Sequence, residues 1–445
     1  MFLKAFFIII VLTICTGVVP KYKVSYNNNF RNRGNIKQEV SQTNNLKWSS
    51  PIEYHISVPS YTDAIDKVIK FLRQKTCLMF SKLSKPVDDR AVLDFDTSHN
   101  NNKAFLGKVN DSHRQKISLN ESCYSRFGCI LKYTLITLGL TPPILREDRN
   151  QYVKINLNNT SDKYKPYFDN TPKESYINIS SFPYDYSSIT HPDQYYYTKK
   201  GNPTIEVIDA NYSYMIGQED APSFQDMKIL NWYYCKHECL RYTNTCRNGG
   251  YQNPYDCTKC VCPTGFGGKN CEGIRRTYQY IELERFVYGK YGAQILSGNE
   301  QWAYRFKTYN DSKIKIVITK LEINKNLPCT EYRGLQVKYE IDKTKTGIIL
   351  CNRKNVSSSN PLNITSEDNS IIVLTNLRDR FDEVTFSAEK VLITNEKTTK
   401  AISTTFETLN KEHASHTTTK GKRKRFENVT TGTGEKTTSL DKKRT

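Results

Sequence analysis

Glycine and proline are scarce in this sequence, with 21 and 16 among 445 residues. These low counts exclude a collagen-like chain and a wholly disordered one, and 12% aromatic residues are too many for a solvated tail. After the N-terminus, no apolar run reaches the roughly 20 residues that cross a bilayer. At about 150 residues per domain, the length suggests roughly three folded domains.

Cysteine, by contrast, is abundant: 13 residues are unusual in a cytosolic enzyme and common in a secreted, disulfide-bonded protein. Residues 1–17 combine Lys4, an apolar run and Gly17, which predicts a secretory signal peptide; a transmembrane anchor would need a longer run. Removal of this segment takes Cys15 away and leaves an even number of cysteines for pairing. We therefore expect a secreted, extracellular protein.

The surface is expected to be basic and glycosylated. Lys and Arg number 65 against 45 Asp and Glu, a formal charge of +20. The basic run Lys422–Arg425 is interpreted as a solvated charge run, with a convertase-type cleavage site or a polyanion-binding patch as alternatives. Nucleic acid is not expected as a partner of a secreted chain. Sequons predict glycosylation at Asn110, Asn120, Asn158, Asn178, Asn211, Asn310, Asn355 and Asn363.

Composition shifts divide the rest of the chain. A polar stretch over 18–45 is expected to be a pro-segment or linker, and 46–235 one folded domain. Seven cysteines fall between Cys235 and Cys271, so 236–272 is expected to be a disulfide-rich module. Alternating apolar residues over 313–318, 335–341 and 371–374 predict strands of an all-β domain over 273–394. The Thr/Lys-rich tail, 395–445, is predicted to be disordered.

The disulfide-rich module resembles an EGF-like domain, because its six cysteines frame the runs Asn248–Tyr251 and Cys262–Cys271. The resemblance implies three bridges: Cys239 with Cys257, Cys246 with Cys260, and Cys262 with Cys271. A zinc site at the closely spaced Cys257, Cys260 and Cys262 is the alternative, and an oxidising lumen favours disulfides. No acidic pair precedes Cys239, so no calcium is implied.

The segment 46–235 resembles the astacin family of secreted zinc metalloendopeptidases. The resemblance rests on Trp48, the runs 146–153 and 184–189, and Ser223–Asp226 with Asn231–Cys235. It implies an α+β, metzincin-type fold, a bridge between Cys77 and Cys235, and a substrate-side edge strand at Ile117–Leu119. The order of peptidase domain, EGF-like module and CUB domain is also common among nematode members of that family.

The residues that would perform the chemistry are replaced. Aligned on two glycines, Gly128 and Gly139, the resemblance places Lys132, Ile136 and Pro142 at the three zinc-ligand positions and Tyr133 at the general-base position. A zinc peptidase needs three neutral imidazoles and a carboxylate that takes the proton of the metal-bound water. The Ile and Pro side chains carry no donor atom, and no HExxH motif occurs in the sequence. His191 is a histidine in this region, but its neighbours are substituted, so it stands alone. We therefore predict no cofactor, with zinc lost, and no enzyme activity.

The sequence is compatible with two arrangements of Lys132 and two of the remaining cysteines. Lys132 could lie on the floor of the cleft, with its charge partly replacing that of a metal, or it could point into water. Cys123 and Cys129 remain after the family bridge is assigned and are only six residues apart, so we predict a local disulfide. An intermolecular bridge is the alternative.

The C-terminal all-β domain resembles a CUB domain. Cys329 and Cys351 bracket the run 332–339 and Thr346-Gly347, and the resemblance implies that they pair. A generic β-sandwich with one disulfide is the alternative, because the second bridge of many CUB domains is absent.

The expected function is that of a secreted, catalytically inactive protease homologue, a pseudoprotease. It would bind extracellular proteins, peptides or acidic glycans through its cleft, its CUB surface and its basic exterior, in an oligomeric state that the sequence leaves open. An exposed edge strand would allow a peptide to be held by β-augmentation. The alternatives are an active zinc metalloendopeptidase, as family membership implies, and a relic under relaxed constraint.

Overall fold

The computed structural model describes residues 47–98, 102–170, 177, 179–276, 279–283, 290–323, 328–351 and 356–393, together with the backbone of 35–36. The expected signal peptide, most of the pro-segment, the tail over 395–445, Asn178 and Asn355 lie outside these residues. The chain up to Val391 forms one compact unit. In the described part, no helix is both long enough and apolar enough to span a membrane.

The N-terminal domain, residues 47–235, contributes five strands to a six-stranded sheet in the order β1-β5-β6-β4-β2-β3, and β1 comes from the segment before it. The pairs of β2 with β3 and β4, and of β4 with β6, are parallel, whereas β5 is antiparallel to β6. The strands are β1 (Asn35–Ile36), β2 (Ile52–Ile56), β3 (Phe80–Lys82), β4 (Leu93–Asp96), β5 (Lys103–Ala104) and β6 (Gln115–Ser118).

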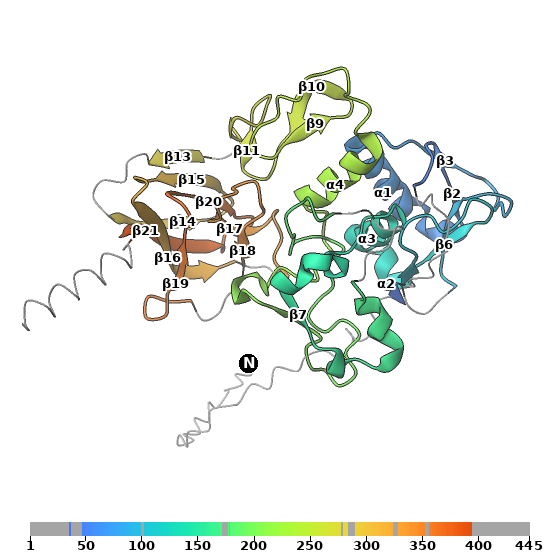
Figure 1. Cartoon of the computed structure of the whole chain (residues 1–445), viewed down its shortest axis with the longest axis horizontal. Coiled ribbons are helices and arrows are strands. Elements are labelled where there is room, and N and C mark those ends of the chain that lie inside the picture. Colours follow the sequence, from blue (N-terminus) through green and yellow to red (C-terminus); the bar gives the residue numbers. More distant parts are fainter. Residues whose placement is uncertain are drawn as a thin grey trace, which may run out of the picture. The chain divides into compact units, whose positions relative to one another are not determined.

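Three helices, α1, α3 and α4, lie close together beside this sheet (Figure 1). Helix α1 (Thr62–Lys75) buries Ile65, Val68, Ile69 and Leu72, which fall on one face at helical spacing. The short α2 (Glu121–Tyr124) leads into α3 (Phe127–Thr137), whose residues from Gly128 to Thr137 are all buried. An α-helix that is buried all round is a core element of its domain.

The second half of the N-terminal domain contains little regular structure before its last helix. After α3, Gly139 takes a φ of +96°, the left-handed conformation that ends a helix and suits glycine. Helix α4 (Phe224–Cys235) starts with a capping box formed by Ser223 and Asp226. The remaining elements are η2 (Pro59–Tyr61), η3 (Pro143–Leu145), η4 (Glu147–Gln151), η5 (Leu157–Asn159), η6 (Asp162–Phe168), η7 (Ala210–Tyr212), and the antiparallel pair β7 (Val153–Ile155) and β8 (Ile205–Val207).

The cysteine-rich segment, residues 236–276, consists of two small antiparallel sheets. They are formed by β9 (Tyr251–Asn253) with β10 (Asp256–Val261), and by β11 (Phe266–Gly267) with β12 (Gly273–Ile274). Three disulfides hold them: Cys239–Cys257, Cys246–Cys260 and Cys262–Cys271. These cysteines are therefore bonded to one another and are not arranged as thiolate ligands of a metal.

The sandwich, residues 279–393, packs two sheets against each other. One has the order β13-β15-β20-β17-β18 and the other the order β14-β21-β16-β19. Their bounds are β13 (Gln279–Leu283), β14 (Lys290–Ser297), β15 (Gln301–Lys307), β16 (Ser312–Glu322), β17 (Gly334–Lys338), β18 (Ile348–Leu350), β19 (Leu362–Thr365), β20 (Ser370–Asn376) and β21 (Glu383–Leu392).

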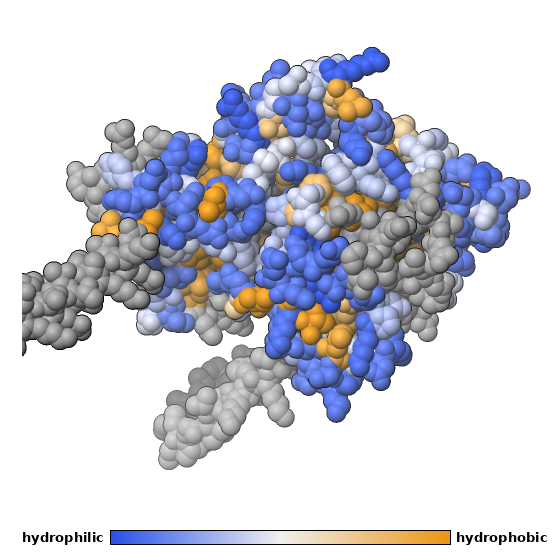
Figure 2. All heavy atoms as spheres, in the orientation of Figure 1, coloured by the Kyte–Doolittle hydropathy of each residue, from blue (hydrophilic) through white to orange (hydrophobic). Residues whose placement is uncertain are grey.

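The predicted strands of the sandwich occur where the alternation indicated, with one difference. In β16, Ile314, Ile316 and Ile318 are buried and alternate with less buried residues, as a half-buried strand requires. The strand expected over 335–341 ends at Lys338, and all its residues are buried, so both of its faces are covered. The face visible in Figure 2 is mainly hydrophilic, with apolar residues in small separate patches.

Candidate active site

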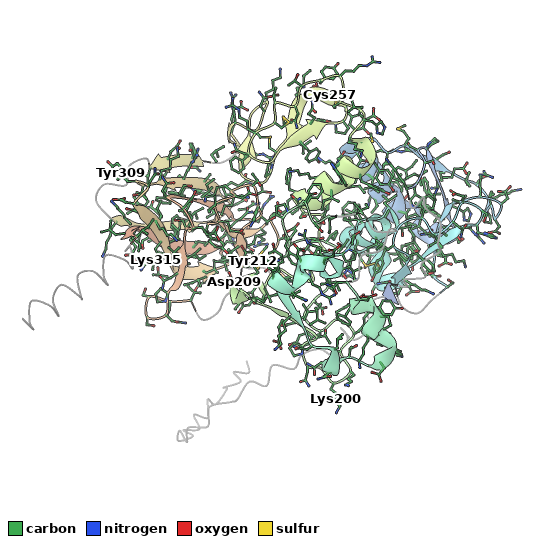
Figure 3. All side chains as sticks on the ribbon, viewed as in Figure 1. Lys200, Asp209, Tyr212, Cys257, Tyr309 and Lys315 are labelled. Carbon is green, nitrogen blue, oxygen red and sulfur yellow. A yellow bond between two sulfur atoms is a disulfide. The ribbon has the colours of Figure 1, made fainter. Side chains whose placement is uncertain are left out.

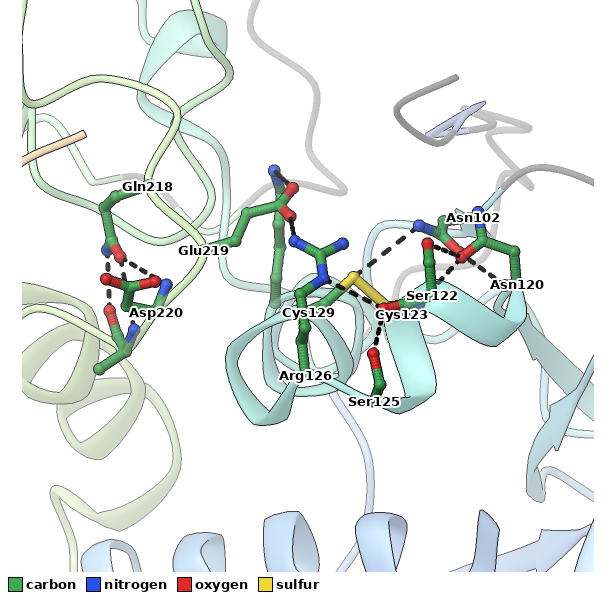
Figure 4. A network of polar contacts seen from close by, with 12 residues as sticks. Asn102, Asn120, Ser122, Cys123, Ser125, Arg126, Cys129, Gln218, Glu219 and Asp220 are labelled. Atoms are coloured by element: carbon green, nitrogen blue, oxygen red, sulfur yellow. Dashed lines mark hydrogen bonds and ion pairs between the residues drawn. A yellow bond between two sulfur atoms is a disulfide. The ribbon is translucent and has the colours of Figure 1, made fainter. Parts of the chain in front are cut away.

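Lys132, at the first of the three ligand positions, is buried within an ion pair. Its side chain lies on α3, the residue is 8% exposed, and its Nζ is 3.2 Å from Glu219 Oε1. The other carboxylate oxygen, Oε2, accepts a hydrogen bond of 2.7 Å from Arg126 Nη1 (Figure 4). Of the two alternatives for Lys132, this contact does not fit a side chain that points into water, because a carboxylate from a distant loop covers its ammonium group.

That loop, residues 217–220, is held tightly over the start of α3. Gly128 leaves no room for a side chain, since a Cβ there would lie 2.0 Å from the carbonyl oxygen of Glu219. Within the loop, the Gln218 side chain donates to the carbonyl oxygens of Ser187 and Ala221, at 2.7 Å each. The position of Glu219 is consequently set by backbone packing and not only by its attraction to cations.

Tyr133, at the general-base position, cannot act as a base near neutral pH. The residue is 2% exposed, and burial is the main reason that its pKa is raised well above its usual value, with the charge of Glu219 as a smaller contribution. Its hydroxyl therefore stays protonated. A group that already holds its proton cannot accept another from an attacking water.

The other two ligand positions carry buried aliphatic side chains. Ile136 is fully buried on α3, and Pro142 is buried just before η3. Neither side chain has a nitrogen, oxygen or sulfur atom to donate to a metal. In the part of the chain that the structure describes, no three His, Cys, Asp or Glu side chains come together in a group that could hold a metal ion.

His191 is fixed in its neutral form by two hydrogen bonds. Its Nδ1 is 2.8 Å from the carbonyl oxygen of Pro192, which can only accept, so Nδ1 carries the proton. The Nε2 atom then accepts from the Tyr184 hydroxyl, 2.9 Å away. Burial lowers the pKa of His191 to about 4, because the charged imidazolium would lose its hydration. Both ring nitrogens are engaged, so His191 has a structural role here.

The depressed pKa of His191 predicts a loss of stability in mild acid. As the pH falls below about 6.5, His191 becomes protonated in the unfolded chain, whereas in the folded chain it stays neutral down to about pH 4. Protonation therefore stabilises the unfolded state, and the free energy of unfolding falls with the pH. Between pH 7 and pH 5 this group should cost about 2 kcal/mol. The measurement is urea unfolding of the wild type and His191→Gln at both pH values. If the free energy of unfolding changes between the two pH values no more in the wild type than in the variant, the prediction is wrong.

All twelve described cysteines are joined in disulfides. Besides the three of the cysteine-rich segment, the structure joins Cys77 to Cys235, Cys123 to Cys129 and Cys329 to Cys351. The Cys123–Cys129 bridge links α2 to α3 beside Asn102 (Figure 4). The structure thus contains the local bridge and not the intermolecular alternative.

The described sequons lie at accessible positions. Asn158, Asn310 and Asn363 are exposed, and Asn110, Asn120 and Asn211 are partly exposed. The Asn120 side-chain oxygen also caps α2 by accepting from the backbone N–H of Cys123. Glycosylation of these residues stays a prediction.

The strand β6 does not lie at the edge of its sheet, contrary to expectation. Strand β5 pairs with it at Lys103 and Ser118, and β1 pairs with β5 in parallel. The outer side of Ile117–Leu119 is therefore partly covered, at Ser118.

Taken together, a largely parallel sheet, the buried helix α3 and the Cys77–Cys235 bridge form the frame of the N-terminal domain, with the substituted positions on and just after α3. Residues 40–235 match the family model for astacin, which is described as a peptidase family. The chain is thus a homologue of the astacin-family zinc metalloproteinases, which confirms the family resemblance over this domain.

Two similar relatives are from Caenorhabditis elegans. The zinc metalloproteinase nas-34 is 31% identical over 368 residues, covering 79% of this chain and 59% of the relative. The zinc metalloproteinase nas-37 is 28% identical, covering 72% of this chain and 40% of the relative. The chain therefore spans about half the length of these relatives. A solved structure, the hatching enzyme zinc-protease high choriolytic enzyme 1 of Oryzias latipes, aligns with a TM-score of 0.38 and 24% identity, covering 44% of this chain and 98% of that one.

The prediction of no cofactor is contradicted by these comparisons. The matched relatives are zinc metalloproteinases, so zinc is the cofactor that the comparisons support. The residues at the three ligand positions do not fit that ion: Ile136 and Pro142 have no donor atom, and the Lys132 ammonium group is paired with Glu219. These three residues therefore supply no ligand set for a catalytic zinc ion.

Proposed function

We propose that this chain is a secreted, catalytically inactive astacin homologue, a pseudoprotease, that acts as an extracellular binding protein. One observation carries the proposal: the general-base position holds Tyr133, a buried hydroxyl whose raised pKa keeps it protonated. Peptide hydrolysis by this family's chemistry needs a base that removes a proton from the attacking water. An active zinc metalloendopeptidase is the second candidate, supported by the names of the relatives.

The rest of the chain supports a binding role. The cysteine-rich segment has the three bridges of an EGF-like module, and the sandwich with its Cys329–Cys351 bridge suits a CUB-like domain. Modules of these kinds act chiefly in interactions. With a formal charge of +20, the chain would attract acidic glycans as well as acidic proteins and peptides.

A cleavage assay with zinc supplied tests the inactivity. We expect no hydrolysis of a mixed, quenched-fluorescent peptide library by the secreted chain in zinc-containing buffer. A relative that keeps the family's His and Glu residues, assayed in parallel, should cleave the library and lose this activity with a chelator. Chelator-sensitive cleavage by this chain, above that of a heat-denatured sample, would restore the enzyme hypothesis. Adding zinc to both samples ensures that the test concerns catalysis and not metal supply.

The binding role is tested separately on immobilised glycans. We expect retention on a sulphated glycan at physiological salt and none on its desulphated counterpart. Equal retention on both would contradict a role for the basic surface, since neutral glycan offers it no charge.

A further inference from the structure

A cavity of about 130 Å³ lies where the N-terminal domain meets the sandwich. Five of its lining residues are tyrosines, and none of the four substituted site positions lines it. Its volume is below the range of about 300–1,000 Å³ that suits whole small-molecule ligands. It suits the end of a single side chain instead. Figure 3 labels two residues of this region, Asp209 and Tyr212.

The aromatic wall is rigid because its rings support one another. Tyr152 stacks on Tyr184 with centroids 4.4 Å apart, and Tyr186 stacks on Tyr212 at 4.3 Å. From the sandwich, Tyr339 approaches Tyr212, with 3.2 Å between their hydroxyl oxygens. Tyrosine rings present a negative π-face and a polar hydroxyl, both of which attract cations.

The charged groups of the cavity are predominantly acidic, although the chain as a whole is basic. The carboxylates of Asp185, Asp209 and Glu340 line it, against a single cation, Lys345. Glu340 is already occupied, because it accepts from the Tyr212 hydroxyl at 2.9 Å and pairs with Lys345. Asp185 is occupied as well, since its oxygens accept hydrogen bonds from the hydroxyl groups of Ser187, Ser223 and Thr346.

Asp209 is the carboxylate of this cavity that can still accept strong hydrogen bonds from a ligand. Its Oδ1 accepts from the backbone N–H of Asn211 at 2.9 Å, which caps η7. Within the described residues, its Oδ2 accepts only a long hydrogen bond, 3.5 Å from the Tyr339 hydroxyl. A carboxylate oxygen beside aromatic rings, without a cation of its own, is the arrangement that receives an ammonium or guanidinium group.

We propose that this cavity binds the cationic end of a basic peptide side chain, with Asp209 as the anion that receives it and the tyrosine rings as its wall. The site would give the chain a way to recognise Arg- or Lys-containing extracellular peptides. It borders the active-site region through Tyr184, which also bonds His191, but none of the four substituted positions lines it, so the proposal does not depend on the loss of catalysis.

The test uses blocked amino acids as probes for the full secreted chain. We expect Nα-acetyl-arginine methylamide, or its lysine counterpart, to bind at least tenfold more tightly than the citrulline compound. Citrulline has the shape of arginine without its charge, so equal binding of all three would overturn the proposal. Titration calorimetry or changes in tyrosine NMR signals would measure the affinities. Failure of both cationic probes to bind at millimolar concentration would also overturn it.

Two substitutions should change this affinity in opposite directions. Asp209→Asn removes the charge but keeps a side-chain oxygen that can cap η7, and it should weaken binding at least fivefold. Lys345→Met removes the competing internal cation and frees Glu340, so it should strengthen binding. Glu206→Gln, an exposed carboxylate on β8 outside the cavity, is the matched control and should change nothing. An unaltered melting temperature shows that each variant is folded, and a folded Asp209→Asn variant with wild-type affinity would refute the assignment.

Discussion

Replacing Glu219 by Gln should lower the free energy of unfolding by about 4 kcal/mol, because it leaves the Lys132 ammonium group buried without a counter-charge. Lys132 is 8% exposed, so water can compensate for little of the lost interaction. Gln keeps the size of the side chain and one oxygen, so the effect measures the charge and not the packing. Urea unfolding of both proteins at pH 7 would determine the difference.

Two further variants separate the buried pair from the exposed one. Arg126 also pairs with Glu219, but its side chain is 47% exposed, so Arg126→Gln should cost less than about 1 kcal/mol. Lys132→Met combined with Glu219→Gln removes both buried charges and should be much less destabilising than Glu219→Gln alone. If Glu219→Gln behaves like Arg126→Gln, then the pair contributes nothing beyond a surface ion pair, and the assigned role of Glu219 is wrong.

Glu219 itself could not be predicted from the sequence. Lys132 and Glu219 are 87 residues apart, and no periodicity or spacing connects a residue on a buried helix with one in an irregular loop. The signal that existed was indirect. Gly128 at the start of α3 and Gly217 in the loop mark close approaches of the backbone, and Gly217 has a φ of +82°.

Local features were predictable because they depend on neighbours in the chain. The apolar face of α1, the helix end at Gly139 and the alternation in β16 each follow from residues within one element. The edge of the first sheet was not predictable in the same way. Strands β1 and β5 have only two residues each, which is too short for a period-2 pattern, yet they lie outside β6.

The cofactor shows a different limit. Residue types at aligned positions can be read from the sequence, and they show that Ile136 and Pro142 offer no donor atoms. Whether a family keeps its metal is a property of the assembled site, because ligands can come from any element that the fold brings near. Residue types at three positions therefore do not determine whether the folded protein has a cofactor.

Removing the Cys77–Cys235 bridge should destabilise the N-terminal domain more than any other change considered for it. The two cysteines are 158 residues apart, and the bridge ties the end of α1 to the end of α4. By loop-closure entropy, the double variant Cys77→Ala with Cys235→Ala should lose about 5 kcal/mol. Urea unfolding under non-reducing conditions is the measurement, with the intact protein as reference.

The Cys123–Cys129 bridge is the matched control, because its loop is short. The two cysteines are only six residues apart, and the same relation gives about 2 kcal/mol for their replacement by Ala. The two bridges differ in a second way that makes the comparison decisive. Cys123 and Cys129 are fully buried, whereas Cys77 is only partly buried. If lost packing dominated, the Cys123–Cys129 variant would therefore lose more stability than the Cys77–Cys235 variant, the reverse of the order expected from loop closure. A larger loss for Cys77–Cys235 would show that restriction of the unfolded chain dominates, and a larger loss for Cys123–Cys129 would show that packing around α3 does.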